Sequence, residues 1–140
     1  MRALVSLLLI ATPALASADT NLQKGTTWDC KKDPVVSIPN GGGKYKLTGP
    51  CSAINLGGGK NTLDIESVDS LNVGGGSNTI TVATADSVNV AGAKNTITIG
   101  TVGTINVAGS SNTITWKKAK TGDKPAMKGQ PDKNTITQGK

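Results

Sequence analysis

The stretch that decides the fold begins at Ile54, where a 17-residue unit reads INLGGGKNTLDIESVDS. The units that follow are LNVGGGSNTITVATADS from Leu71, VNVAGAKNTITIGTVGT from Val88 and the shorter INVAGSSNTITW from Ile105, and they align without a gap. A unit this small cannot bury its own apolar face, so it needs stacked neighbours on both sides. The sequence therefore predicts an all-β protein, a short parallel β-solenoid (β-helix) with 17-residue coils.

Each unit contains two short stretches in which apolar and polar residues alternate. In the third unit these are Val88–Val90 and Thr96–Ile99, joined by a small Gly-rich corner. Period-2 alternation places one set of side chains inside and the other outside. A third apolar side is supplied by Val68, Ala85 and Val102. We therefore expect each coil to be triangular, with the Gly at 57–59 and 74–76 permitting positive φ at the corner.

Two columns of asparagine recur with the same period. One contains Asn61, Asn78, Asn95 and Asn112, and the other contains Asn55, Asn72, Asn89 and Asn106. Stacked amides can hydrogen-bond along the axis of such an assembly, and Asn at a corner can satisfy turn backbone groups. We interpret both columns as structural ladders. The alternative fold is an antiparallel β-meander with one hairpin per unit, which would pair strands of unlike sequence.

The repeats extend in weaker form beyond the four aligned units. A fifth NTIT begins at Asn134, beyond position 129 where the period would place it, which fits one more coil with a five-residue insertion. Upstream, Ile38 to Leu47 resembles a degenerate first coil, in which Ile38 corresponds to Ile54 of the next unit. The predicted organisation is an N-terminal cap and degenerate first coil at 19–53, four repeats at 54–116, and a Lys-rich insertion with the final coil or cap at 117–140.

Residues 1–18 have the pattern of a signal peptide. Met1-Arg2 is followed by an apolar stretch that ends near Leu15, and small residues at Ala16 and Ala18 offer two cleavage sites. We expect an exported protein, periplasmic or extracellular, with no transmembrane segment after the signal is removed. In such a compartment Cys30 and Cys51, the two cysteines of the chain, are expected to form a disulfide that ties the N-terminal cap to the first coil.

The composition offers little for catalysis. The chain has no His, and with both cysteines oxidised it lacks the usual zinc ligands and Cys/His nucleophiles, so no cofactor, metal or catalytic residue is expected. Carboxylates are the remaining candidates. Asp64 and Glu66 share a strand face, and Asp69 and Asp86 are expected to stack on adjacent coils. Such pairs leave a glycan-cleaving solenoid or a weak divalent-ion site as alternatives.

Two surfaces could bind a partner. The candidate binding face consists of Thr79, Thr81, Thr96, Thr98, Thr113 and Thr115. The candidate basic patch consists of Lys117, Lys118, Lys120 and Lys124. The basic patch lies in the segment 117–140, where seven Lys oppose Asp123 and Asp132 for a net charge of +5. It suits an anionic envelope polymer or lipid head groups, or it blocks edge-to-edge growth as a cap; it lacks the interleaved aromatic residues of a nucleic-acid site.

The sequence also resembles a known family. The segment Tyr45–Cys51, the iterated Gly-x-x-Asn-Thr units and the closing Asn134–Thr137 are similar to bacterial domain-of-unknown-function family 3060. The resemblance implies a secreted or envelope-associated bacterial protein, without an assigned activity or catalytic residues. Taken together, these features favour a non-catalytic secreted or cell-envelope structural or interaction module. A polysaccharide-binding or glycan-cleaving solenoid is the alternative, and an ice-binding Thr-x-Thr face is a remote one.

Overall fold

A computed structural model describes residues 19–129 and 133–140, and all of the regular structure in these residues is β-strand. The predicted signal peptide at 1–18 lies outside the described residues. The strands are β1 (Thr20–Asn21), β2 (Thr27–Asp29), β3 (Val35–Ile38), β4 (Lys44–Leu56), β5 (Thr62–Val73), β6 (Thr79–Val90), β7 (Thr96–Val107), β8 (Thr113–Ala119), β9 (Ala126–Gly129) and β10 (Thr135–Gln138). In the described residues, no helix is long and apolar enough to cross a membrane.

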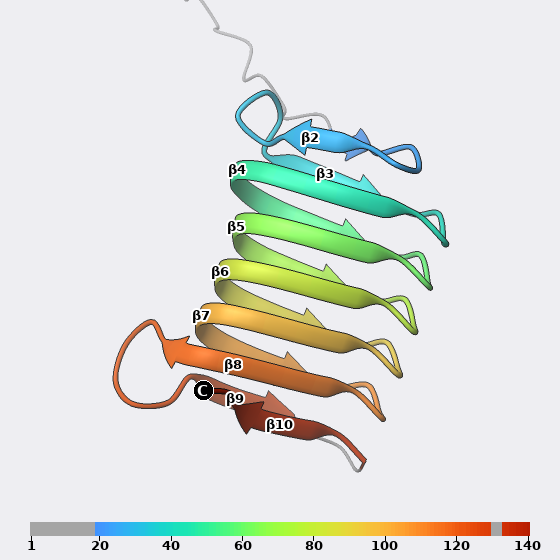
Figure 1. Cartoon of the computed structure of the whole chain (residues 1–140). Helices are drawn as coiled ribbons and strands as arrows, with labels where there is room; N and C mark the ends of the chain where they lie inside the picture. The colour runs from blue at the N-terminus through green and yellow to red at the C-terminus, as the bar shows by residue number, and fades with distance from the viewer. Residues whose placement is uncertain (1–18, 130–132) are drawn as a thin grey trace, which may run out of the picture.

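The ten strands form one sheet that winds around a central core. The strand order is β1-β3-β4-β5-β6-β7-β8-β10, while β2 pairs with β4 and β9 pairs with β7. Figure 1 shows about six turns stacked along one axis, with the N-terminal strands at the top and β10 at the bottom. Every strand pairing in the described residues is parallel. The parallel β-solenoid is therefore confirmed, and the antiparallel meander is wrong.

The interior is built from aliphatic columns, as the alternation predicted. The backbone pairs Leu63 with Ile80, Ile80 with Ile97 and Ile97 with Ile114, each one coil further along. A second column contains Ile65, Val82, Ile99 and Trp116, and the third side contains Val68, Ala85 and Val102. All of these side chains are buried. Branched aliphatic side chains pack well at the coil spacing of roughly 4.8 Å, which is why so few aromatic residues are needed.

The Gly-rich corner has a different physical basis from the one expected. At the corners that precede β5 to β8 and β10, the positive φ angles fall on Lys60, Ser77, Lys94, Ser111 and Lys133, with values of 59–69°, and in the first coil the equivalent residue is Gly42, with a φ of 73°. The Gly at 57–59 and 74–76 do not adopt positive φ, so that expectation was wrong. Instead, a Cβ at Gly75 or Gly92 would lie 1.9 or 1.8 Å from the carbonyl oxygen of the preceding coil. Glycine is required at this one position of the corner, which Gly58, Gly92 and Gly109 occupy in other coils, because the coils approach too closely there for any side chain.

The disulfide between Cys30 and Cys51 is present, as predicted, with both residues buried. It joins the N-terminal segment to β4, where Trp28 of β2 pairs with Leu47.

The register of the first coil differs from the one expected. Ile38 was expected to correspond to Ile54, but Val36 pairs with Ile54 and Ile38 pairs with Leu56. One extra residue in β4, between Leu47 and Pro50, shifts the register within the same coil, and Gly49 in that bulge has a φ of 75°. The residues of this coil therefore do not all lie the same number of positions from their partners in the next coil.

The C-terminal insertion contains fewer residues than the Lys-rich segment in which it was predicted. Val102 pairs with Ala119, which keeps the 17-residue period. Thr104 pairs with Ala126, however, whereas the same period would supply Thr121. The five extra residues therefore lie between β8 and β9, where the chain leaves the solenoid and returns. Figure 1 shows this loop standing out from the side of the last coils.

Candidate binding face

The candidate binding face is a flat array of threonines on one side of the solenoid. Thr79, Thr96 and Thr113 are paired in one column, and Thr81, Thr98 and Thr115 in the next. These side chains are exposed, except that of Thr115, which is half-buried. The array lies on the side that faces the viewer in Figure 1, where β8 and β10 run. Ranks are roughly 4.8 Å apart along the axis, and the two columns are roughly 7 Å apart.

The structure contains a further rank of threonines, whose position in the array was not predicted from the sequence. Strand β10 pairs with β8 so that Thr135 lies next to Thr113 and Thr137 next to Thr115. Four complete ranks are thus contiguous, and Thr62 extends the first column by one coil at the other end. The fifth NTIT was the signal for this rank. Its register could not be assigned because the sequence did not show where the five inserted residues leave the coil.

The face ends in charged residues toward the N-terminus. Asp64 takes the place of threonine in the second column, and Lys46 pairs with it in the preceding coil. A groove of about 380 Å³ lies beside them, lined in part by Asp64 and Glu66. Glu66 accepts a hydrogen bond from the backbone N–H of Gly49 at 2.8 Å, which uses one of its oxygens to hold the bulge in β4.

The buried Asn ladder fixes the edge of this face. The Oδ1 atom of Asn78 accepts the backbone N–H of Asn61 at 2.9 Å, and its Nδ2 donates to the carbonyl oxygen of Gly58 at 3.1 Å. The same contacts recur for Asn95 and Asn112. Each Asn is followed by a Thr of the first column, and the Thr79 N–H donates to the carbonyl oxygen of Asn61 at 2.8 Å. The Thr side chains of β6, β7 and β8 therefore project from a backbone that is hydrogen-bonded on both sides.

A row of alternating lysine and serine borders the Thr face at the corner. It consists of the positive-φ residues Lys60, Ser77, Lys94, Ser111 and Lys133, all exposed. Each row residue precedes an Asn of the ladder, and the Asn precedes a Thr of the first column. The row and the Thr columns therefore run side by side along the axis of the solenoid.

The four residues of the predicted basic patch lie on two different elements. Lys117 and Lys118 lie on β8 and are exposed, while Lys120 and Lys124 lie in the loop that follows. Lys120 forms an ion pair with Asp86, and both side chains are about half exposed, at 49% and 48%. Gly103 occupies the equivalent position in the coil between these two. The ion pair uses one lysine of the patch and one member of the expected Asp69–Asp86 pair.

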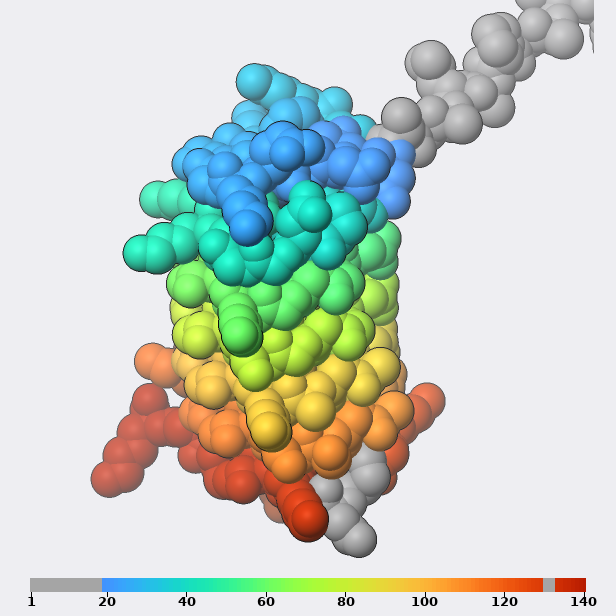
Figure 2. All heavy atoms as spheres, turned by 90° about the vertical axis from the view of Figure 1, so that its right-hand side faces the viewer, coloured from blue at the N-terminus to red at the C-terminus, as the bar shows by residue number. Residues whose placement is uncertain are grey.

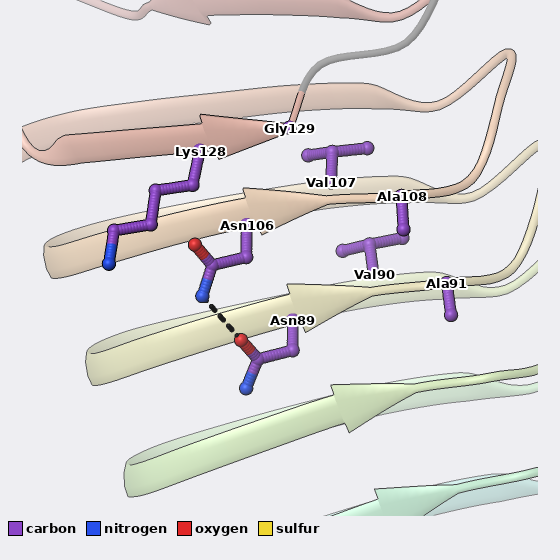
Figure 3. Close-up of a pocket in the computed structure, with 8 residues that line it drawn as sticks. All are labelled: Asn89, Val90, Ala91, Asn106, Val107, Ala108, Lys128 and Gly129. Carbon is purple, nitrogen blue, oxygen red and sulfur yellow. Dashed lines mark hydrogen bonds between the residues drawn. The ribbon is translucent and has the colours of Figure 1, made fainter.

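A separate shallow groove of about 390 Å³ lies on another side of the solenoid, over the ends of β6, β7 and β9. Figure 3 shows Asn106 and Asn89 along one edge, with the Nδ2 of Asn106 donating to the Oδ1 of Asn89 at 2.7 Å. The Oδ1 of Asn106 is buried and, among the described residues, has no hydrogen-bond partner. Lys128 follows Asn106 in the same column, so this second Asn ladder ends at a lysine.

Within the described ranges, no three His, Cys, Asp or Glu side chains form a group that could hold a metal ion. Comparison with known proteins gives one match. A family model described as "Protein of unknown function (DUF3060)" matches residues 43–86 and again residues 73–126, so the resemblance seen in the sequence is confirmed. No curated protein and no solved structure matches the chain.

Proposed function

The chain belongs to the DUF3060 family, and we propose that it is a non-catalytic interaction module that binds an extended, repetitive glycan along its Thr face. The observation that carries this proposal is the array itself, with two columns of threonine in four consecutive coils in strict register. The disulfide and the signal-like N-terminus support a secreted or periplasmic location, which is where envelope glycans are found.

A threonine array suits a glycan for chemical reasons. Each hydroxyl both donates and accepts a hydrogen bond, as sugar hydroxyls do. The methyl group beside it gives apolar contact to the C–H groups of a sugar ring. Threonine is also stiff at χ1, and β6, β7 and β8, which carry three of the four ranks, are hydrogen-bonded on both sides, so little side-chain freedom is lost on binding. A periodic face of this kind complements a periodic ligand.

Contacts of the carboxylates favour binding over glycan cleavage. Cleavage by the usual mechanism needs two carboxyl groups that flank one bond, one of them with a raised pKa. In this protein Glu66 holds the backbone of the β4 bulge, and Asp86 pairs with Lys120. These two acidic groups are therefore engaged in the structure of the coils.

The proposal is tested by removing hydroxyls without changing shape. The triple variant Thr81→Val, Thr98→Val and Thr115→Val keeps β-branched side chains of equal volume on the face. The matched control is Thr84→Val with Thr101→Val, which are half-buried threonines of the same coils beyond the next bend. Binding to a panel of immobilised polysaccharides is measured for each. We expect the triple variant to bind about tenfold or more weakly, since each lost hydrogen bond is worth about 1 kcal/mol.

The control variant should bind as the unmodified protein does. If the triple variant bound as tightly as the unmodified protein, the Thr face would not be the binding site. Binding to no member of the panel would exclude the glycan class.

A second candidate function is adsorption to ice, and the fourth Thr rank is the observation that favours it. With that rank the array is longer than the sequence indicated, with spacings of roughly 4.8 and 7 Å. Thermal hysteresis of the protein in solution measures this activity directly. Hysteresis that disappears in Thr98→Tyr, where a large side chain breaks the plane, would support adsorption to ice over glycan binding.

A further inference from the structure

We propose that the glycan bound by the Thr face is acidic, with one anionic group per disaccharide, and that these groups contact Lys60, Lys94 and Lys133. This inference rests on the proposed function and names the ligand class more narrowly. In this arrangement the polymer lies along the axis of the solenoid. Its acidic groups face the corner row, and its hydroxyls face the threonines.

The first support is the alternation of the row. Five successive coils place Lys, Ser, Lys, Ser and Lys at one backbone position, where φ is 59–69°. Hydrogen bonds fix that position: the N–H of Lys60 donates to Gly76 at 3.0 Å, and that of Lys94 donates to Ser110 at 3.2 Å. All three lysines are exposed, and none of them takes part in the ion pair between Lys120 and Asp86.

The second support is the spacing. Lysines two coils apart stand roughly 9.6 Å from each other along the axis, twice the strand spacing of roughly 4.8 Å. That distance matches the length of one disaccharide in an extended glycan. A polymer with an acidic group on every second sugar therefore meets one ammonium group per repeat, and a serine hydroxyl of the row lies between.

The third support is the position of the row beside the Thr columns. Lys60 and Thr62 are separated only by Asn61, which is buried, so the two exposed side chains flank one corner of the coil. The same relation holds for Lys94 with Thr96. Figure 2, turned so that the corner side faces the viewer, shows the coils stacked in one continuous column along this side. One glycan chain can thus contact the row and the threonines together, with a charge-assisted hydrogen bond at each lysine.

The test uses three oligosaccharide probes of equal length that differ in acid spacing. Hyaluronan has one carboxylate per disaccharide, polygalacturonate has one on every sugar, and chitin oligosaccharides have none. The variant Lys60→Ser, Lys94→Ser and Lys133→Ser copies the serines at 77 and 111, so the backbone position tolerates it. The control Lys117→Ser, Lys118→Ser and Lys124→Ser removes the same charge elsewhere.

Hyaluronan should bind the row variant about tenfold more weakly, because three exposed ion pairs together are worth on the order of one factor of ten. It should bind the control within about twofold, and its binding should weaken as salt shortens the Debye length below about 10 Å. Equal losses in the row variant and the control would overturn the proposal in favour of general charge attraction.

A charge-preserving variant tests the spacing itself. Ser77→Lys combined with Lys94→Ser keeps the net charge but moves two lysines into adjacent coils. Hyaluronan should then bind more weakly and polygalacturonate should not. Unchanged hyaluronan binding would overturn the spacing argument. If the Thr variant loses chitin binding while the row variant binds hyaluronan normally, the proposed function stands and this inference fails. If none of the three probes binds, this inference fails, and the proposed function is decided by the wider polysaccharide panel.

Discussion

Asn95 accepts two hydrogen bonds from Asn78 at a single atom. Its Oδ1 lies 2.9 Å from the backbone nitrogen of Asn78 and 3.1 Å from the Nδ2 of the same residue. Its own Nδ2 donates to the carbonyl oxygen of Gly75 at 3.0 Å. One buried amide therefore satisfies two donors and one carbonyl oxygen of the preceding corner, and it links that corner to the next coil.

Replacing Asn95 with Ala should lower the free energy of unfolding by about 3 kcal/mol, because two buried donors and the carbonyl oxygen of Gly75 lose their partner, and the Oδ1 of Asn112 loses one of its donors. Chemical denaturation of both proteins measures the difference. Asn89→Ala is the matched control, since Asn89 belongs to the partly exposed ladder where water can replace the lost contact. An Asn95 variant as stable as the Asn89 variant would show that the buried ladder contributes no more than the partly exposed one.

The corner glycines predict a contrast between neighbours. A Cβ at Gly92 would lie 1.8 Å from the carbonyl oxygen of Gly75, whereas the nearest atom to a Cβ at Gly74 is 3.7 Å away. Gly92→Ala should therefore cost about 3 kcal/mol or more, because backbone must move to make room. Gly74→Ala should be neutral or slightly stabilising, and the equivalent positions already hold Ala91 and Ala108. Thermal unfolding of the pair measures this contrast, and similar melting temperatures would contradict it.

The positive-φ row predicts a stabilising substitution. Ser77 has a φ of 60°, a region that disfavours side chains by about 1–2 kcal/mol and leaves glycine unstrained. Ser77→Gly should therefore stabilise the protein by about 0.5–1 kcal/mol, since part of the relief is lost to greater freedom in the unfolded chain. Ser77→Val should destabilise it, because a β-branched residue fits this region poorly. If chemical denaturation showed Ser77→Val to be more stable than Ser77→Gly, the backbone at position 77 would not be strained.

The disulfide predicts a local effect at the N-terminal end. Replacing Cys30 and Cys51 together by Ser should cost about 3 kcal/mol, from the entropy of a loop of this size. The loss should be concentrated in β2 and β3, which lie over β4 at the end of the solenoid. Amide hydrogen exchange should show faster exchange there and little change in β6 and β7. Uniformly faster exchange would contradict a role limited to the cap.

Much of this fold could be predicted because the same 17-residue pattern occurs in four aligned units. Any residue 17 positions from another is its neighbour in β5 to β7, so the columns of Ile97 and Thr98 followed directly from the alignment. The prediction was less accurate where the period changes. The bulge at Gly49 puts two registers into one coil, and the alignment of Ile38 with Ile54 could not describe it.

The candidate site was only partly visible in the sequence. The exposed threonines followed from alternation, but the rank of Thr135 and Thr137 required the location of the insertion. The lysine row was missed altogether. It depends on positive φ at Lys60 and Lys94, and lysine is not a residue that signals such a conformation. The ion pair of Lys120 with Asp86 was missed because the segment from Lys117 was assigned to the insertion, whereas the 17-residue period continues to Ala119 and places Lys120 two coils from Asp86.

The central claim is that the Thr face binds a glycan, and the most direct measurement is a map of the contact by NMR. Threonine methyl and backbone amide signals are followed while a binding oligosaccharide from the polysaccharide panel is added. We predict shifts at Thr79, Thr81, Thr96 and Thr98 and in β10, with the signals of Thr84 and Thr101 unmoved. Glycan binding by the Thr face would be contradicted if the signals of the face did not move and the shifts were confined to the groove beside Asn106 or to Lys117–Lys124.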